Sequence, residues 1–391
     1  MITVAAALDH LFDLADEMPV EHVPLLEGDG RVLAETVAAR RTQPPFAAAS
    51  MDGYALKSVE ADLHAQFKVV GEAAAGHGWS GTVGAGQAVH IFTGAPVPAG
   101  TDKVVIQEDV SRSGDLITIT DDPGPKDNIR AAGIDFAKGD SVEAPRRLAP
   151  ADIALLAAMN ISKVPVRRAP KVALIATGDE LVMPGEDPGP DQIVASNTFG
   201  LAAMLRRIGA TPRVLPIARD SAVSLTTVFG LTGDADLIVT IGGASVGDHD
   251  LVAQVAGELG MDRSFYKVAM RPGKPLMAGR LNGTPMVGLP GNPVSAMVCG
   301  TIFLTPMIRA MQGLGKHPIA RIQMPLSAPL ATNGPREHYL RARVTDGTVA
   351  DAGLQDSSLL SVLASANALI VRPPDDLARD IGDVVDVVHL T

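Results

Sequence analysis

Residues 237–250, LIVTIGGASVGDHD, join a strand pattern to side chains that can bind anions and metal ions. Residues 237–241 are apolar or β-branched, which is typical of a strand buried on both faces. Gly242 and Gly243 let backbone N–H groups turn toward an anion. The carboxylates that follow are hard oxygen ligands of the kind that Mg²⁺ prefers. The residues after the two glycines include Ser245, Gly247, Asp248 and Asp250. A tight turn with two solvated aspartates explains this stretch equally well.

Two other apolar runs also end in polar turns. Residues 172–176 lead into Thr177, Gly178, Asp179 and Glu180, and residues 285–289 lead into Pro290, Gly291, Asn292, Pro293, Val294 and Ser295. In the second turn Asn292 can cap a helix that starts at Pro293, so that unpaired N–H groups form an oxyanion cradle. Taken alone, each turn is also explained by acidic or capping residues that stabilise the N-terminus of the following helix. Together the three turns favour one shared cleft, because parallel strands end at one edge of a sheet.

A cationic segment lies between the second and third turns. Lys267, Arg271 and Lys274 alternate with apolar residues around a Pro-Gly turn. An exposed cationic strand edge is a common alternative. Next to the three turns, these cations are predicted to neutralise a phosphate or another oxoanion.

Composition excludes several classes of protein. A net charge of −11 argues against nucleic acid as a partner. The 46% hydrophobic content includes no run near the ~18 residues of a membrane span, and the N-terminus lacks a basic leader, so we expect a cytoplasmic protein. The single Cys299 rules out an intrachain disulfide.

The motif of a phosphate-binding Walker loop is incomplete. Gly242 and Gly247 have Walker spacing, but Asp248 and His249 follow, which disfavours an ATPase.

The elements that must position these residues follow from periodicity. A helix over residues 3–18, capped by Thr3, must pack on something distant in sequence. Short strand-like runs mark residues 40–139 as a β-rich module, at 67–70, 88–92, 103–106 and 116–120. A further helix is predicted over 150–159. Residues 319–391 form a second β module, with strands at 321–324, 339–344 and 384–390.

Between residues 170 and 318 strands alternate with helices, which predicts a parallel-rich sheet with helices on both faces. The strands are expected at 172–176, 214–217, 237–241 and 285–289. One intervening helix presents Leu201, Met204, Leu205 and Ile208 on one face, and a long helix starts at Pro293. The fold class is therefore α/β plus all-β modules in a chain of several domains.

Taken together, these stretches resemble the MoeA family of molybdopterin molybdenumtransferases, which also includes the C-terminal domain of gephyrin. The matching segments run in family order: PPF…MDGYA, GEAAAG, IFTGAPVPAGTDKVVIQED, NIRAAGIDFAKGD, ATGDEL, SNTFGLAAML, IGGASVGDHD, KVAMRPGKP and GLPGNPVSAM. The resemblance implies insertion of molybdate into the dithiolene of adenylylated molybdopterin, with Mg²⁺-dependent release of AMP.

The resemblance also implies domains and partners. Residues 1–20 and 170–318 would form the three-layer molybdopterin-binding domain, residues 21–39 and 140–169 a linking domain, residues 40–139 the elongated β-rich domain and residues 319–391 a C-terminal β-barrel-like domain. The family forms a homodimer whose cleft lies between the α/β domain of one subunit and the β module of the other. Other molybdenum-cofactor enzymes are candidate partners.

Site residues carried over from the family fall into three groups. The Mg²⁺ ligands are Glu180, Asp220, Asp248 and Asp250. The catalytic residues are Asp52, Thr93, Asp135, Glu180, Asp220 and Asp250. The substrate-binding residues are Arg130, Thr177, Gly178, Asp179, Gly242, Gly243, Ser245, Gly247, Lys267, Arg271, Lys274, Pro275, Pro290, Pro293, Ser295, Arg341 and Ser357. The partner subunit would contribute Asp52, Thr93, Arg130 and Asp135, and the C-terminal module Arg341 and Ser357.

Two departures from the family pattern and three rival functions remain open. Residues 47–50 read Ala-Ala-Ala-Ser where the family often has Asp-Asn-Ser-Ala, and Asp356 stands where glycine is usual. The second departure places a carboxylate near the expected molybdate pocket. The rivals are an adenylyltransferase acting on bare molybdopterin, a non-catalytic scaffold like gephyrin, and a tungstate-handling paralogue. The β modules argue against the first.

Overall fold

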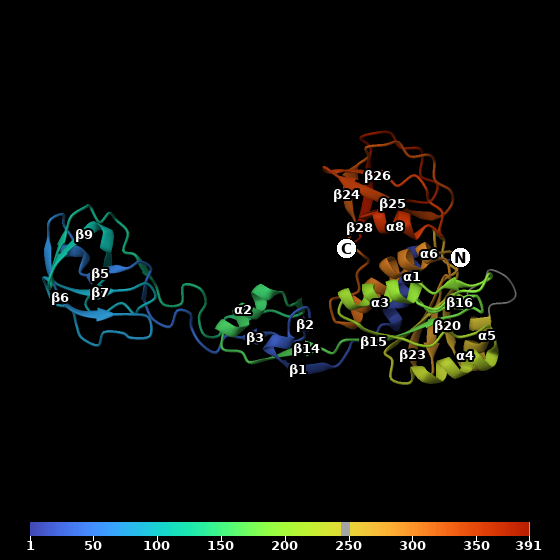
Figure 1. The fold of residues 1–391 in the computed structure, drawn as a ribbon, viewed down its shortest axis with the longest axis horizontal. Coiled ribbons are helices and arrows are strands. Elements are labelled where there is room, and N and C mark those ends of the chain that lie inside the picture. Colours follow the sequence, from blue (N-terminus) through green and yellow to red (C-terminus); the bar gives the residue numbers. More distant parts are fainter. Residues whose placement is uncertain (244–250, 391) are drawn as a thin grey trace. The chain divides into compact units, whose positions relative to one another are not determined.

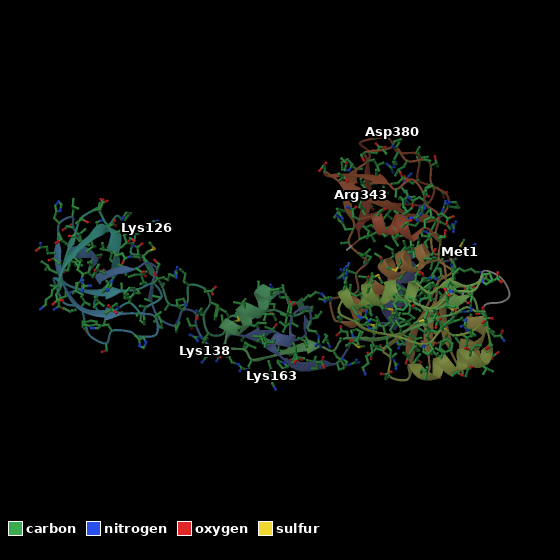
Figure 2. All side chains as sticks on the ribbon, viewed as in Figure 1. Met1, Lys126, Lys138, Lys163, Arg343 and Asp380 are labelled. Carbon is green, nitrogen blue, oxygen red and sulfur yellow. The ribbon has the colours of Figure 1, made fainter. Side chains whose placement is uncertain are left out.

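The computed structural model describes residues 1–243 and 251–390, which form two compact units. The first unit comprises Met1–Glu21, Gly30–Ala34 and Val166–Thr391. The second comprises His22–Asp29 and Glu35–Pro165. Figure 1 labels the helices and strands of each unit, and Figure 2 adds the side chains, with Lys126 and Lys138 marking the second unit and Arg343 and Asp380 the first.

A six-stranded sheet in the order β18-β15-β19-β23-β22-β20 forms the centre of the first unit. Its strands are β15 (Lys171–Ala176), β18 (Thr211–Val214), β19 (Leu237–Ile241), β20 (Asp262–Tyr266), β22 (Met277–Leu281) and β23 (Thr284–Leu289). The first four strands of that order are parallel to one another, whereas β22 is antiparallel to its two neighbours, β23 and β20. The predicted strands 172–176, 237–241 and 285–289 are confirmed. The strand predicted at 214–217 was placed too late, because Thr211–Val214 is the segment that pairs with β15.

Helices cover both faces of this sheet, as predicted (Figure 1). One face packs on α1 (Val4–Leu14), α3 (Asn197–Arg207), α6 (Pro293–Cys299) and α7 (Thr305–Met311), the other on α4 (Ala222–Phe229) and α5 (Leu251–Glu258). Alternation along β15 divides the two cores, since Val172 and Leu174 join the first and Ala173 and Ile175 the second. Leu11 of α1 is fully buried in the first core, so the N-terminal helix packs on distant chain, as predicted. The Thr3 hydroxyl accepts a hydrogen bond from the Ala6 N–H (3.2 Å) and caps α1.

The long helix predicted from Pro293 runs to Met311, with a π-helical turn at Gly300–Leu304 between α6 and α7. Its length and mean hydropathy of 1.5 satisfy the requirements of a membrane span. The helix still contains no uninterrupted apolar run of ~18 residues, as expected from the sequence, because polar residues such as Thr301 and Arg309 lie within it. The structure buries 83% of this window inside the protein, as expected of a core helix.

The C-terminal module is a sheet in the order β21-β25-β27-β28-β24, with β26 paired to β25. Its elements are β21 (Met270–Arg271), β24 (Ile322–Pro325), β25 (Glu337–Thr345), β26 (Thr348–Asp351), α8 (Leu360–Ser365), β27 (Ala368–Arg372) and β28 (Val384–His389). The three predicted strands are confirmed within a few residues. Because β21 comes from the α/β part and pairs with the start of β25, it joins this module to the residues around Arg271.

The second unit is β-rich, as predicted, with a main sheet in the order β8-β5-β7-β6-β10-β9. These strands are β5 (Gly53–Leu56), β6 (Gln66–Ala73), β7 (Gln87–Ile91), β8 (Lys103–Ile106), β9 (Val110–Ser113) and β10 (Leu116–Ile119). Two short pairs join β4 (Ala48–Ala49) to β11 (Ile129–Arg130) and β3 (Val37–Ala38) to β12 (Ser141–Val142). The predicted helix 150–159 is α2 (Pro150–Ala158).

The remaining elements are short. They are β1 (Val20–Pro24), β2 (Val32–Leu33), β13 (Arg146–Arg147), β14 (Lys163–Arg167), β16 (Leu181–Val182), β17 (Ile193–Val194) and the 3₁₀ turns η1 (Leu25–Glu27), η2 (Ser58–Glu60), η3 (Gln107–Asp109) and η4 (Gly230–Thr232). The pair β16 and β17 follows the first polar turn and contributes residues to the pocket described next.

Candidate active site

The turns that follow β15, β19 and β23 line one cavity of about 1200 Å³ in the first unit. These strands are parallel neighbours in the sheet, so their carboxyl ends meet at one edge. The predicted site residues that line this cavity are Thr177, Gly178, Glu180, Asp220, Gly242, Gly243, Arg271, Lys274, Pro275, Pro290, Pro293, Ser295 and Ser357. Ser245, Gly247, Asp248 and Asp250 lie outside the described residues.

The first turn holds the Glu180 carboxylate directly over Gly178. The backbone of Gly178 has φ +146°, and a Cβ added there would lie 2.3 Å from Glu180 Oε2. The backbone conformation therefore favours glycine, and a side chain at this position would displace the Glu180 carboxylate. Glu180 is exposed to the cavity, whereas Thr177 at the end of the strand is buried.

Asp179 and Arg219 connect this turn to Asp220. Asp179 Oδ1 accepts a hydrogen bond from the Asp220 N–H (3.0 Å), and Asp179 is not among the residues that line the cavity. Arg219 Nη1 donates to the carbonyls of Gly178 (3.5 Å), Asp179 (3.0 Å) and Leu181 (3.0 Å). The structure thus gives Asp179 a bridging position and presents Glu180 and Asp220 to the cavity from two linked turns.

The second turn needs both of its described glycines. Gly242 has φ +94° and Gly243 has φ +68°. A Cβ on Gly242 would lie 2.8 Å from the Thr177 carbonyl oxygen, and one on Gly243 would lie 2.2 Å from Val252 Cγ2. The two glycines therefore allow the first and second turns to pack closely at the floor of the cavity.

The third turn differs from its predicted role in two respects. Asn292 occupies the N-cap position of α6, but its side chain makes no capping hydrogen bond. Instead Asn292 Nδ2 donates to Ser357 Oγ (3.1 Å). The Val294 N–H, one of the groups expected to face an oxyanion, donates to the Ser357 carbonyl (3.0 Å). Ser295 is only 3% exposed and still lines the cavity.

Three cations line the cavity, and one of them was missed by sequence reasoning. Arg271 and Lys274 were predicted, and Arg336 joins them. None of the three forms an ion pair with an acidic side chain among the described residues. Lys267 does not line the cavity, and its Nζ lies 4.9 Å from the ring centroid of Tyr266. No local pattern marked Arg336, which precedes β25 and is placed by the pairing of β25 with β21.

Arg341 was predicted to face substrate, but the structure buries it to 2% exposure and uses it to hold a loop. Arg341 Nη1 donates to the Asp356 carbonyl (2.7 Å) and Nε to Gln355 Oε1 (3.2 Å). Burial lowers the pKa of its guanidinium, and the nearby Asp356 carboxylate partly offsets that effect. Residues 355–358 of this loop line the cavity, whereas Arg341 does not and instead holds the backbone of the loop.

Asp356 also lines the cavity, as its sequence position suggested. Its Oδ1 atom accepts hydrogen bonds from the Ser358 hydroxyl (2.6 Å) and the Ser358 N–H (2.8 Å). These bonds hold the pKa of Asp356 below its usual value. An ionised carboxylate therefore lies in the same loop as Ser357.

The remaining predicted residues belong to the second unit, and none of them lines this cavity. Asp52 Oδ1 accepts hydrogen bonds from the N–H (2.7 Å) and the hydroxyl (2.8 Å) of Thr93, which lower the pKa of Asp52. Arg130 and Asp135 are exposed. Of the departing residues 47–50, Ala48 and Ala49 are buried in the strand pair β4–β11.

The α/β sheet with these turns at its strand ends belongs to a known class of domain. Residues 173–310, which contain it, match the family described as "Probable molybdopterin binding domain". Residues 2–160 match the "MoeA N-terminal region (domain I and II)", and residues 323–390 match the "MoeA C-terminal region (domain IV)". The chain belongs to the MoeA family. The domain boundaries predicted from the sequence stay predictions.

Relatives and solved structures agree with this membership over nearly the full length. A protein of Nostoc sp. named molybdopterin molybdenumtransferase is 34% identical over 96% of this chain and 90% of its own. Molybdopterin molybdenumtransferase 2 of Mycobacterium tuberculosis is 35% identical over 94% and 95%. A crystal structure of the molybdopterin biosynthesis MoeA protein from Pyrococcus horikosii covers 100% of this chain and 99% of its own, at 31% identity and a TM-score of 0.84. Family membership makes the chain a transferase of molybdenum cofactor biosynthesis.

Proposed function

We propose that this cavity binds adenylylated molybdopterin together with molybdate, and that the protein inserts molybdenum into the dithiolene with release of AMP. The observation that carries the proposal is that Glu180 and Asp220 line the same cavity as Arg271, Lys274 and Arg336. A site for this reaction needs cations for an oxoanion and carboxylates for a metal ion close to a phosphoanhydride. Relatives named molybdopterin molybdenumtransferase support the same activity.

The basic residues suit molybdate, which is a tetrahedral dianion. Arg271, Lys274 and Arg336 offer charge-assisted hydrogen bonds, and among the described residues no acidic side chain forms an ion pair with them. Ser295 and Ser357 add hydroxyl donors to the same lining. Glu180, Asp220 and Asp356 line the same cavity, so direct hydrogen bonds from these cations, rather than net charge, would retain an anion here.

The acidic residues suit Mg²⁺. Glu180 and Asp220 are exposed to the cavity, are hard oxygen donors, and form no ion pair among the described residues. Mg²⁺ is commonly held by one or two carboxylates together with water and substrate phosphate, so this pair fits the ion. The described residues contain no cluster of three His, Cys, Asp or Glu ligands, and the predicted ligands Asp248 and Asp250 lie outside them. When bound, Mg²⁺ would supply neutralisation of charge on the leaving phosphate.

The chain's own contribution is positioning and electrostatics. No nucleophilic side chain is needed, because an oxygen of molybdate or water attacks the phosphorus. Arg219 holds the backbone of the first turn at three carbonyls, and Asp179 ties that turn to Asp220. The backbone that carries the two carboxylates is therefore held in place before substrate arrives, which lowers the reorganisation required during the reaction.

The proposal includes a homodimer. Asp52, Thr93, Arg130 and Asp135 are assigned to the cleft of the partner subunit, an assignment that rests on the family resemblance. The hydrogen bonds that Thr93 donates to Asp52 support a preorganised carboxylate in the second unit.

The test is a titration of the purified protein with molybdopterin-AMP, Mg²⁺ and molybdate, followed by AMP release and molybdenum incorporation. We expect both signals to rise together and to require all three components. Glu180→Gln should reduce AMP release at least about a hundredfold, since Mg²⁺ contributes several kcal/mol to the transition state, and should leave the melting temperature unchanged. ATP consumption with bare molybdopterin would instead indicate an adenylyltransferase, and inactivity with every substrate would indicate a scaffold.

A further inference from the structure

We infer that Asn292 is a positioning residue that makes the Ser357 hydroxyl a hydrogen-bond donor to the oxoanion, an inference that rests on the proposed function. The two residues come from different modules of the first unit. Asn292 precedes α6 of the α/β part, and Ser357 lies between β26 and α8 of the C-terminal module. Both line the cavity.

The direction of one hydrogen bond carries the argument. Asn292 Nδ2 donates to Ser357 Oγ over 3.1 Å. A serine hydroxyl has one proton to donate and two lone pairs, so an oxygen that accepts from an amide keeps its proton for another acceptor. The Ser357 hydroxyl donates to no other described residue. Its proton is therefore available to an acceptor inside the cavity, and a molybdate oxygen is such an acceptor.

The backbone around Ser357 is fixed from both sides, which keeps the hydroxyl in place. The Val294 N–H donates to the Ser357 carbonyl (3.0 Å). Arg341 Nη1 donates to the preceding carbonyl of Asp356 (2.7 Å) from its buried position. With the main chain held by these bonds, the Asn292 amide determines how the remaining rotor, the hydroxyl, is oriented.

Asn292 could instead cap α6, and Asp356 could instead accept the Ser357 proton, but neither contact is formed. Asn292 stands at an N-cap position but makes no capping bond, so its amide is not needed by the helix. Asp356 is the carboxylate adjacent in sequence to Ser357, and among the described residues its oxygens accept hydrogen bonds from Ser358 and none from the Ser357 hydroxyl. The Ser357 proton is therefore left for the ligand.

A double-mutant cycle tests the inference. The variants are Asn292→Ala, Ser357→Ala and the double variant, measured by titration with sodium molybdate and by the KM for molybdate in the transfer assay. Ser357→Ala should weaken molybdate binding about tenfold, the value of one hydrogen bond to a charged group. Asn292→Ala should weaken it by about threefold to tenfold, and the double variant should match Ser357→Ala, because Asn292 acts through the hydroxyl.

Asn292→Asp provides the sharper comparison, since aspartate has the same shape but accepts the hydroxyl proton. We expect a loss of molybdate affinity of about a hundredfold, with the KM for molybdopterin-AMP changed by less than roughly threefold. All variants should melt within roughly 2 °C of the wild type, because Asn292 does not cap α6.

The failures of the two proposals can be told apart. The inference would be overturned if Asn292→Ala weakened molybdate binding by the same factor with and without the Ser357 hydroxyl. Asn292 would then contact the substrate independently of Ser357. Wild-type protein that binds and transfers molybdate while Asn292→Ala behaves like wild type would overturn it as well. Wild-type protein that neither binds nor transfers molybdate would overturn the proposed function itself.

Discussion

At the scale of single residues, similar side chains that lie close together in the sequence differ in whether they face the cavity. Glu180 faces the cavity, whereas Asp179 beside it accepts the Asp220 N–H and does not line the cavity. Arg336 lines the cavity, whereas Arg341 is buried under the loop that carries Ser357. In each pair the residue that is turned away fixes the backbone of a residue that faces the cavity, so both members are expected to affect activity.

Gly178→Ala tests how closely the first turn is built around Glu180. The backbone at φ +146° is strained for alanine, and the new Cβ would displace the Glu180 carboxylate. We expect a loss of about 1–3 kcal/mol in the free energy of unfolding and a fall of at least about tenfold in AMP release. Urea unfolding and the titration assay measure the two effects. Gly230→Ala is the matched control, because a Cβ there meets nothing within 4 Å; equal behaviour of both variants would refute the prediction.

At the scale of elements, β25 brings a histidine into a basic environment. His338 is paired with Arg271 of β21 on one side and with Arg372 of β27 on the other. Burial, and after it the positive charges of Arg271, Arg336, Arg372 and Arg341, lower the pKa of His338 to about 4. The histidine is therefore neutral at physiological pH, and the positive charge near the cavity comes from arginine and lysine.

This shift predicts how stability depends on pH. The unfolded chain binds a proton at His338 near pH 6.5, while the folded chain does so only near pH 4, so stability falls as the pH drops from about 6.5 toward 4. The contribution is at most about 3 kcal/mol. His338→Gln should flatten the pH dependence of the free energy of unfolding between pH 7.5 and 5, measured in urea. Parallel curves for wild type and His338→Gln would contradict the assignment.

At the scale of the whole molecule, the predicted site residues divide between two units. Glu180 and Asp220 belong to the first unit, and Asp52 and Thr93 to the second. The family resemblance predicts that each cleft of a homodimer combines the α/β domain of one subunit with the β module of the other. A closed twofold dimer would then contain two identical clefts.

Subunit complementation tests this arrangement. Asp52→Asn and Glu180→Gln should each be inactive as homodimers. A mixture that has reassociated at random should regain roughly a quarter of wild-type AMP release, because half of the dimers are mixed and each has one intact cleft. Mixing Glu180→Gln with Asp220→Asn should regain nothing, since both changes affect the same unit. Sedimentation should give twice the 40.5 kDa mass of the chain, and a monomeric mass or absent complementation would refute the shared cleft.

The sequence by itself determined the framework of the site. Residues 172–176, 237–241 and 285–289 are apolar runs that end in glycine-rich turns, and their alternation with helices predicted parallel strands whose ends share an edge. The amphipathic pattern of α1 likewise required a distant packing partner. These features depend on local periodicity, which a sequence records directly.

Only the tertiary structure decided which polar atoms face the cavity. Whether Arg336 or Arg341 lines it depends on how β25 pairs with β21 and β27, and pairing between segments far apart in the chain leaves no local signal. The N-cap position of Asn292 could be predicted, but the bond that its amide makes depends on Ser357, which arrives from another module. The sequence determines which donor, acceptor and charged groups each residue carries. Contacts between distant segments determine which of those groups face the cavity.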